Sequence, residues 1–199
     1  MFPLSTVLFP GCPLPLHVFE HRYRALVADC LAGDRRFGVV LIARGSEVGG
    51  GDERHGVATV AEIEMARPEA DGRWLLAARG VERARVTRWL SDDPYPRAVV
   101  EPWASDPAVD GAALRAAEQA VRRAQALLSE LGDTPAPAPR WSLGDSPEEI
   151  VWRLCALAPV TALDRQRLLE APDAAARLAL LVELVDAVGD DVDKLLSGG

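Results

Sequence analysis

The sequence predicts an α+β protein in which a strand-rich lobe, residues 1–105, precedes a helical lobe, residues 106–199. Short β-branched or apolar runs separated by glycine, proline and aspartate fill the first lobe, and this pattern is typical of strands. From Asp106 onward, apolar residues recur at the spacing of three and four that an amphipathic helix requires. With 49% hydrophobic and 26% charged residues, the 199-residue chain can bury a sizeable core.

The first lobe is expected to hold one helix among its strands. The helix, Glu20–Leu31, places its apolar residues at helical spacing and ends at Gly33. Asp71-Gly72 predicts a tight hairpin turn because glycine accepts a positive φ, and Gly80 is expected to serve a bulge or turn. The expected strands are Thr6–Phe9, Leu14–Val18, Phe37–Ala43, Val57–Ala66, Arg73–Arg79, Arg83–Leu90 and Ala98–Pro102.

The second lobe is expected to contain four helices. The first, Ala112–Leu131, is rich in strong helix formers. The Pro-rich segment 133–147 cannot join a helix or a central strand, so it should cross the surface. Ser146-Pro147-Glu148-Glu149 predicts a helix start, because its hydroxyl, proline and glutamate together satisfy the first turn. Thr161 and Asp173 are N-cap candidates for two further helices.

The net charge of −8 is unevenly divided between the two lobes. Residues 1–105 hold 13 basic and 14 acidic residues, a balance of −1, whereas residues 106–199 hold 9 basic and 16 acidic residues, a balance of −7. Nucleic acids and anionic membranes are bound through lysine and arginine, so the second lobe should repel both. Neither nucleic acid nor membrane is therefore expected as a partner.

The opening segment also bears on location. Its longest uncharged run, Met1–Phe19, contains four prolines, which would break the roughly 20-residue helix that crosses a membrane. The run also lacks the basic start and proline-free apolar stretch of a secretory signal. The three cysteines form no C-x-x-C pair, so buried thiols are expected rather than a disulfide framework or zinc ribbon. We therefore expect a cytoplasmic protein.

One pattern suggests metal chemistry. His17 to His21 fits H-x-x-E-H, the inverted zinc-peptidase pattern, and is the one route to an enzyme in this sequence. Two histidines four residues apart bind one metal only from the same helical face, and Pro13 and Pro15 place His17 on a strand. Lys194 is the only lysine, and the chain has neither a Gly-x-Ser-x-Gly elbow nor a Walker A loop. No catalytic residue, metal or cofactor is expected.

The opening of the chain carries the most specific pattern. Leu8-Phe9-Pro10-Gly11 leads to Pro15-Leu16-His17-Val18-Phe19-Glu20 and then to Arg22-Tyr23-Arg24. This opening resembles the Lon protease N-terminal, substrate-binding domain family, particularly its free-standing members. Further runs resemble that family in the same order, so the resemblance covers nearly the whole chain. They are Phe37–Ile42, Gly56–Ile63, Asp71–Arg73, Arg79–Arg83, Pro94-Tyr95 and Arg165–Leu184.

This resemblance implies a PUA-like, partly open β-barrel in the N-terminal lobe, packed against a C-terminal helical bundle. In complete Lon-type proteases this domain precedes an ATP-driven unfoldase and a Ser–Lys peptidase, and it helps to capture substrates. Because the chain ends before either module, the resemblance implies a non-catalytic module. Its expected partner is unfolded or extended polypeptide, with a role as an adaptor for an ATP-dependent protease or chaperone; the oligomeric state stays open. RNA binding is the alternative, since PUA-like folds include RNA binders.

Polypeptide capture is expected at an apolar groove or at a strand edge, where backbone pairing adds affinity. The aromatic candidates could form a pocket, or they could lie in the core as such residues usually do. The charged candidates could orient a peptide, or they could form internal ion pairs that hold strand to helix. Arginines clustered on one face would favour RNA, whereas an apolar groove rimmed by arginine would favour peptide. The candidates are Phe9, Phe19, Glu20, Arg22, Tyr23, Trp74, Arg79 and Arg83.

Overall fold

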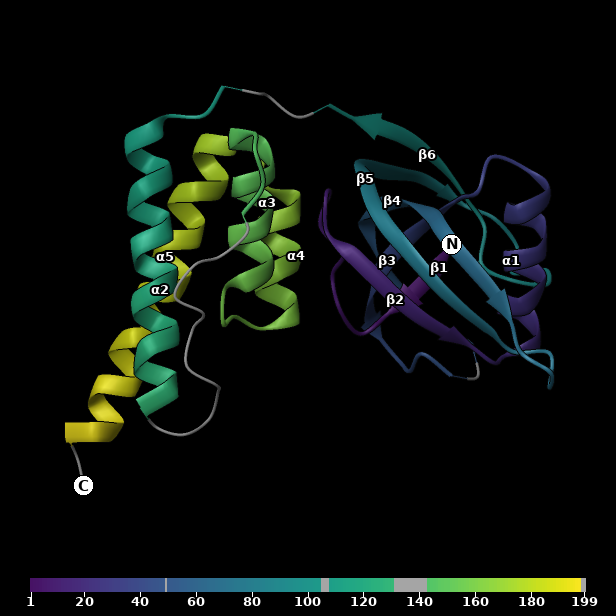
Figure 1. The fold of residues 1–199 in the computed structure, drawn as a ribbon, viewed down its shortest axis with the longest axis horizontal. Helices are drawn as coiled ribbons and strands as arrows, with labels where there is room; N and C mark the ends of the chain where they lie inside the picture. Colours follow the sequence, from purple (N-terminus) through teal and green to yellow (C-terminus); the bar gives the residue numbers. More distant parts are fainter. Residues whose placement is uncertain (49, 105–107, 131–142, 198–199) are drawn as a thin grey trace. The chain divides into compact units, whose positions relative to one another are not determined.

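The computed structural model describes residues 1–48, 50–104, 108–130 and 143–197. The chain divides into two compact units, Met1–Ala104 and Ser105–Gly199, and each is described by itself. The first unit holds the sheet and one helix, and the described part of the second unit holds four helices (Figure 1). The α+β class is therefore confirmed. The expected packing of the β lobe against the helical bundle stays a prediction.

A single six-stranded sheet forms most of the first unit. Its pairing order is β1-β3-β4-β5-β2, and β6 also pairs with β5. β1 pairs with β3 in parallel, whereas the other pairs are antiparallel. The sheet curls, but β1 and β2 at the two ends of this order do not pair with each other, so the barrel is partly open (Figure 1). The strands are β1 (Phe2–Leu4), β2 (Pro13–Val18), β3 (Arg36–Arg44), β4 (Glu53–Pro68), β5 (Trp74–Trp89) and β6 (Ala98–Trp103).

The first strand differs from the prediction. Phe2–Leu4 forms β1, whereas the predicted strand Thr6–Phe9 is irregular. β1 pairs with Val39–Leu41 of β3, a distant partner that no local pattern reveals. Val7, Leu8 and Phe9 are buried without belonging to a strand, and the Thr59 hydroxyl donates to the Leu8 carbonyl oxygen over 2.6 Å. This side-chain bond replaces a ladder bond for one buried carbonyl.

The two strands predicted on either side of Gly80 are one strand, β5. Its first half pairs with β2 and its second half with β6, while β4 runs along its other edge. The β4–β5 register shifts between the pairs Val60–Glu82 and Ala61–Gly80, which leaves one extra residue in β5. A Cβ at Gly80 would lie 2.4 Å from the carbonyl oxygen of Phe9. The predicted bulge is therefore confirmed, and glycine is required because another chain segment passes so close.

Local turn and helix signals in the first unit agree with the prediction. The turn at Asp71-Gly72 joins β4 to β5, and Gly72 adopts a φ of +82°. The helix α1 (His21–Ala32) buries Tyr23, Leu26 and Val27. β4 begins at Glu53, four residues before the predicted start, because Glu53 and Arg54 pair with the end of β3.

The second unit contains α2 (Gly111–Glu130), α3 (Pro147–Leu157), α4 (Ala162–Glu170) and α5 (Ala174–Ser197). Ser146 and Glu149 form the capping box before α3, Thr161 caps α4, and the Asp173 carboxylate accepts a hydrogen bond from an amide of α5. The predicted starts of these helices are confirmed. Most of the predicted crossover 133–147 lies outside the described residues.

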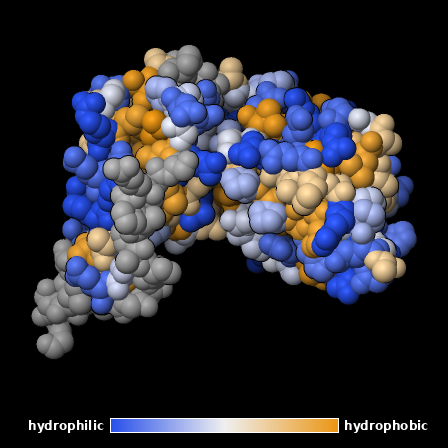
Figure 2. Space-filling model, viewed as in Figure 1, coloured by the Kyte–Doolittle hydropathy of each residue, from blue (hydrophilic) through white to orange (hydrophobic). Residues whose placement is uncertain are grey.

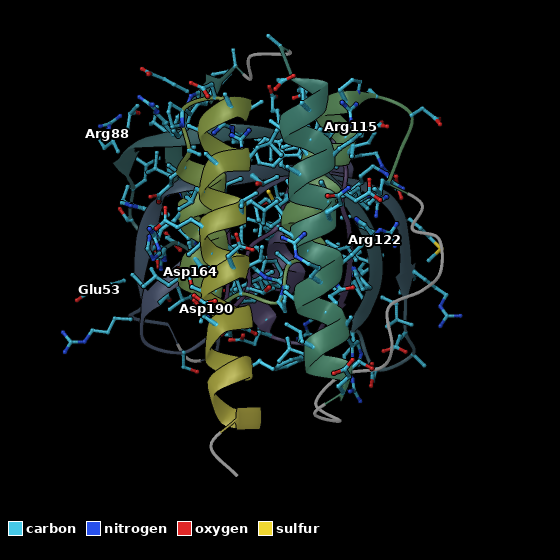
Figure 3. The ribbon with its side chains drawn as sticks, turned by 90° about the vertical axis from the view of Figure 1, so that its left-hand side faces the viewer. Glu53, Arg88, Arg115, Arg122, Asp164 and Asp190 are labelled. Atoms are coloured by element: carbon cyan, nitrogen blue, oxygen red, sulfur yellow. The ribbon has the colours of Figure 1, made fainter. Side chains whose placement is uncertain are left out.

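The helices α2 and α5 make the most extensive helix pair of this unit, and they lie side by side and run in the same direction (Figures 1 and 3). A groove of about 440 Å³ between them is lined partly by charged residues, with Arg123 of α2 lying 3.5 Å from Asp186 of α5. Among the helices of the described residues, none carries the long apolar stretch that a membrane span requires. The cytoplasmic location stays a prediction.

Candidate functional site

A pocket of about 230 Å³ opens in the first unit where β1, the end of β2, the start of α1 and the loop before β4 come together. Its walls are largely apolar, and two glutamates, a histidine and a tyrosine supply polar groups. A pocket with apolar walls and a few polar groups is the usual form of a binding site. The residues that line it are Phe2, Leu4, Pro15, Leu16, His17, Val18, Phe19, Glu20, Tyr23, Glu47 and Val48.

The junction between β2 and α1 determines which side chains reach the pocket mouth. The strand alternates, so Val18 is buried and Phe19 points outward with 53% of its surface exposed. Glu20 keeps an extended backbone, with φ −68° and ψ 139°, and is the N-cap residue of α1. An exposed aromatic ring and a carboxylate therefore stand next to each other at a strand-to-helix turn.

Tyr23 forms an inner wall of the pocket. Its ring stacks on the Phe2 ring with 4.2 Å between centroids, and the Arg22 guanidinium lies 4.4 Å from its centre. The hydroxyl is buried, and it has no hydrogen-bond partner among the described residues. Burial raises the pKa of Tyr23 to about 12, so the hydroxyl is neutral at physiological pH. This wall thus carries a buried polar atom that a ligand or water could satisfy.

Arg22 ties the loop before β4 to the junction. Its Nε donates to Glu20 Oε2 over 3.2 Å, and its Nη2 donates to the Glu47 carbonyl oxygen over 3.0 Å. The Glu47 carboxylate in turn accepts a hydrogen bond from the Ser5 amide, just beyond β1. The Glu20–Arg22 pair is therefore an internal ion pair that shapes the rim, which was one of the two roles that the sequence left open.

His17 and His21 lie on different elements. His17 belongs to β2 and its Nε2 lies 2.8 Å from Glu69 Oε2, whereas His21 is the first residue of α1. They do not share a helical face, as the prolines upstream predict. In the part of the chain that the structure describes, no three histidine, cysteine or acidic side chains gather in a geometry that could hold a metal ion.

Three of the eight candidates line this pocket, a fourth contacts its rim, and the other four lie elsewhere in the first unit. Phe19, Glu20 and Tyr23 line the pocket, and Arg22 holds its rim. Phe9 and Arg83 are buried elsewhere in the unit, and the Arg83 guanidinium lies 4.3 Å from the centre of the Trp103 ring. Arg79 is exposed beside Glu64, with its Nε 2.6 Å from Oε1, and Trp74 pairs with Val18 at the start of β5.

Pocket residues that the sequence did not suggest come from distant segments. Phe2 belongs to β1, and Glu47 and Val48 belong to the glycine-rich loop before β4. The parallel β1–β3 pairing, the stacking of Phe2 on Tyr23 and the Arg22 contact bring them to α1. The abundant glycines of the loop hint at a bend there, but no local signal identifies its contact with Arg22.

The free edge of β2 is a poor place for strand addition. Proline cannot donate a backbone hydrogen bond to β5, so the backbone N–H and C=O groups of Leu14, Leu16 and Val18 point toward β5. The backbone groups of Pro13 and Pro15 then point toward the free edge. Proline has no N–H, and a strand added there would find carbonyls without the matching donors. Of the two predicted modes of capture, the groove suits this region and the β2 edge does not.

A second pocket of about 220 Å³ lies over β3, β4, β5 and β6. Its walls are mostly small or aliphatic, because Ala58 and Ala84 are register partners on β4 and β5. Met1 covers part of it, and a Cβ at Gly38 would lie 2.3 Å from the Met1 sulfur. The sequence pattern missed this pocket because it depends on small residues that meet across strands.

The surface of the first unit mixes apolar and charged side chains. Figure 2 shows its hydrophobic areas divided by hydrophilic residues on the face in view. Phe19 and Val48 are the exposed large apolar residues that also line a pocket at the junction. Exposed apolar side chains beside a concavity are typical of interaction sites.

A model of the family described as the ATP-dependent protease La (LON) substrate-binding domain matches residues 1–187. Lon protease 2 of Myxococcus xanthus is 30% identical over 190 residues, and Lon protease of Anaeromyxobacter dehalogenans is 27% identical over the same length. Each match covers 92% of this chain but 22% of the relative, so the chain spans less than a quarter of their length.

The crystal structure of a Lon N-terminal domain protein from Xanthomonas campestris has the same fold. It is 30% identical, superimposes with a TM-score of 0.65, and the match covers 92% of this chain and 95% of that one. The family match extends from the sheet through most of the helical unit. The chain therefore belongs to the family of Lon (ATP-dependent protease La) substrate-binding domains.

Proposed function

We propose that this chain is a non-catalytic module that binds unfolded or extended polypeptide at the pocket between β1, the β2–α1 junction and the loop before β4. The observation that carries the proposal is the exposed Phe19 at the mouth of that pocket, in a member of a substrate-binding family. An unfolded chain presents apolar side chains that a folded protein buries. An exposed aromatic ring beside an apolar hollow is a surface on which they can be buried.

The proposed module works as an adaptor for an ATP-dependent protease or chaperone. The matched relatives are Lon proteases in which the corresponding region is 22% of the length. We infer that a substrate-binding region which is a minor part of a large protease passes polypeptide on to the rest of that protein. By analogy, this chain would hold a polypeptide and present it to such machinery.

RNA binding is the less favoured function. Many arginines of the first unit lie beside carboxylates, so they are not available as an unopposed basic face. The chain as a whole carries a net charge of −8, which opposes the approach of RNA. The arginine–carboxylate pairs include Arg22–Glu20, Arg36–Glu62, Arg54–Asp52, Arg73–Asp71 and Arg79–Glu64.

The test is binding of a fluorescent, reduced and alkylated polypeptide that stays unfolded, measured by anisotropy against the same polypeptide in its folded form. We expect the unfolded form to bind and the folded form not to bind. The variant Phe19→Ser should weaken binding about tenfold, as loss of an aromatic anchor at an interface does. Met65→Ser is the matched control, because Met65 is 55% exposed but does not line the pocket.

Absence of binding to the unfolded polypeptide would reject the proposed function. If Phe19→Ser and Met65→Ser weakened binding equally, polypeptide binding would stand but its site would lie away from this pocket. Circular dichroism of both variants checks that each remains folded. Single-stranded RNA added as a competitor tests the alternative: displacement that disappears at higher salt would favour RNA.

A further inference from the structure

We infer that the pocket at the β2–α1 junction takes the side chain of a basic residue, arginine or lysine, from the bound polypeptide. This inference rests on the proposed function and adds to it the chemical class of the side chain recognised. Three features of the pocket support it: an excess of negative charge, a buried hydroxyl without a partner, and apolar walls that suit a long side-chain stem.

The pocket carries more negative than positive charge. Glu20, Glu47 and His17 line it. His17 already lies beside the Glu69 carboxylate, and Arg22 is the cation that contacts both lining glutamates. Arg22 reaches the Glu20 carboxylate through Oε2 but touches Glu47 only at its backbone carbonyl. The Glu47 carboxylate has the Ser5 amide as its partner through Oε1. Within residues 1–48 and 50–104, the second oxygen of each carboxylate has no hydrogen-bond partner.

Tyr23 adds a second, independent reason. It is 3% exposed and lines the pocket, and its Oη has no hydrogen-bond partner in the described chain. A buried hydroxyl without a partner is unfavourable, and it can accept a hydrogen bond from an ammonium or guanidinium group. The two carboxylates would favour an ammonium or guanidinium group over a neutral donor, because hydrogen bonds between charged groups are stronger than those between neutral groups.

The apolar walls fit the rest of a basic side chain. Phe2, Leu4 and Val18 surround the polar groups, and Phe19 stands at the mouth. Lysine and arginine bury their methylene stems against such surfaces while the charged end seeks polar partners, and a cation also interacts with an aromatic face. An acidic side chain would be repelled by the two carboxylates. An aliphatic side chain would remove water from the carboxylates without giving them a hydrogen bond.

The test uses three labelled, unstructured peptides that are identical except for one central residue, which is arginine, leucine or glutamate. We expect the arginine peptide to bind about tenfold more tightly than the leucine peptide, equivalent to one well-placed charge interaction, and the glutamate peptide to bind most weakly. Raising the salt concentration should reduce the preference for arginine, because part of it is electrostatic.

Variants identify the groups responsible. Glu47→Gln keeps an oxygen for the Ser5 amide but removes the charge, so it should reduce the arginine preference to less than about threefold. Tyr23→Phe removes the buried hydroxyl and keeps the ring, so it should also reduce the arginine preference. Glu62→Gln is the matched control, because Glu62 also lies beside an arginine, Arg36, but outside the pocket. This control should keep the full preference.

The possible results separate the two proposals. Equal binding of all three peptides, or tighter binding of the leucine peptide, would overturn the proposal that the pocket takes a basic side chain. The proposed polypeptide binding would remain. An arginine preference that survives Glu47→Gln and Tyr23→Phe would also overturn it, because another surface would then be responsible. If neither these peptides nor the unfolded polypeptide binds, the proposed function itself fails.

Discussion

The Phe2 ring of β1 stacks on the Tyr23 ring of α1, with 4.2 Å between their centroids and 15° between their planes. This contact joins the first strand to the helix, and both rings line the same pocket. Phe2 also lies 6.2 Å from the Phe37 ring of β3. One buried ring therefore both supports the sheet and forms the pocket wall, so stability and binding are linked at this position.

Replacement of Phe2 tests that link. Phe2→Ala should lower the free energy of unfolding by about 3 kcal/mol, the usual cost of removing a buried phenylalanine ring. Phe19→Ala should lower it by about 0.5 kcal/mol or less, since most surface substitutions change little. Urea denaturation followed by circular dichroism measures both. Equal losses for the two variants would contradict the placement of Phe2 in the core.

Gly80 should not tolerate a side chain. Gly80→Ala would place a Cβ 2.4 Å from the Phe9 carbonyl oxygen, a backbone atom that cannot move aside cheaply. We expect a loss of about 2–3 kcal/mol in stability, comparable to overpacking a core. Gly56→Ala is the control on β4, because its Cβ would meet no atom within 4 Å. Thermal unfolding of the two variants should show a large drop in Tm for the first alone.

Arg177 should not be replaceable by lysine. Its guanidinium is buried, donates to the carbonyl oxygens of Leu168 and Ala171 over 2.9 and 3.0 Å, and lies 3.8 Å from the centre of the Trp152 ring. A lysine cannot reproduce this planar fork, so Arg177→Lys should cost about 2 kcal/mol. The exposed Arg167→Lys should cost about 0.5 kcal/mol or less in the same chemical denaturation experiment.

The chain contains two tyrosines, and both should lose their protons at a higher pH than a free tyrosine does. Burial raises the pKa of Tyr23 to about 12, and a hydrogen bond to Asp29 with added burial raises that of Tyr95 to about 12. The absorbance at 295 nm should therefore change near pH 12 in the folded protein and near pH 10 in urea. Tyr23→Phe should remove about half of this change without shifting the remainder, since two tyrosines contribute.

The same shifts predict how stability depends on pH. A tyrosine with a raised folded-state pKa holds its proton more tightly when folded, so its contribution to stability is complete below pH 10. This contribution is lost as the pH rises through about 12. Unfolding free energies measured from pH 8 to 12 should be level at first and then fall. A fall that begins well below pH 10 would contradict tyrosine as the cause.

Local chemistry explains what could be predicted. The capping box at Ser146 and Glu149 and the turn at Asp71-Gly72 depend on residues within three positions of each other, so the sequence alone locates them. Helical periodicity likewise predicted α1 and the four helices of the second unit. β1 was missed because it depends on a parallel pairing with β3, which no local spacing encodes.

The sequence by itself determined the α+β class, most elements and, through ordered motifs, the family of this protein. The tertiary structure decided which candidates are accessible: Phe9 and Phe19 are both aromatic residues near β2, yet one is in the core and the other exposed. It also decided which distant residues share the pocket, since the Arg22 hydrogen bond joins Glu47 to α1. Side-chain periodicity records local geometry, whereas burial and site formation depend on contacts between segments far apart in the chain.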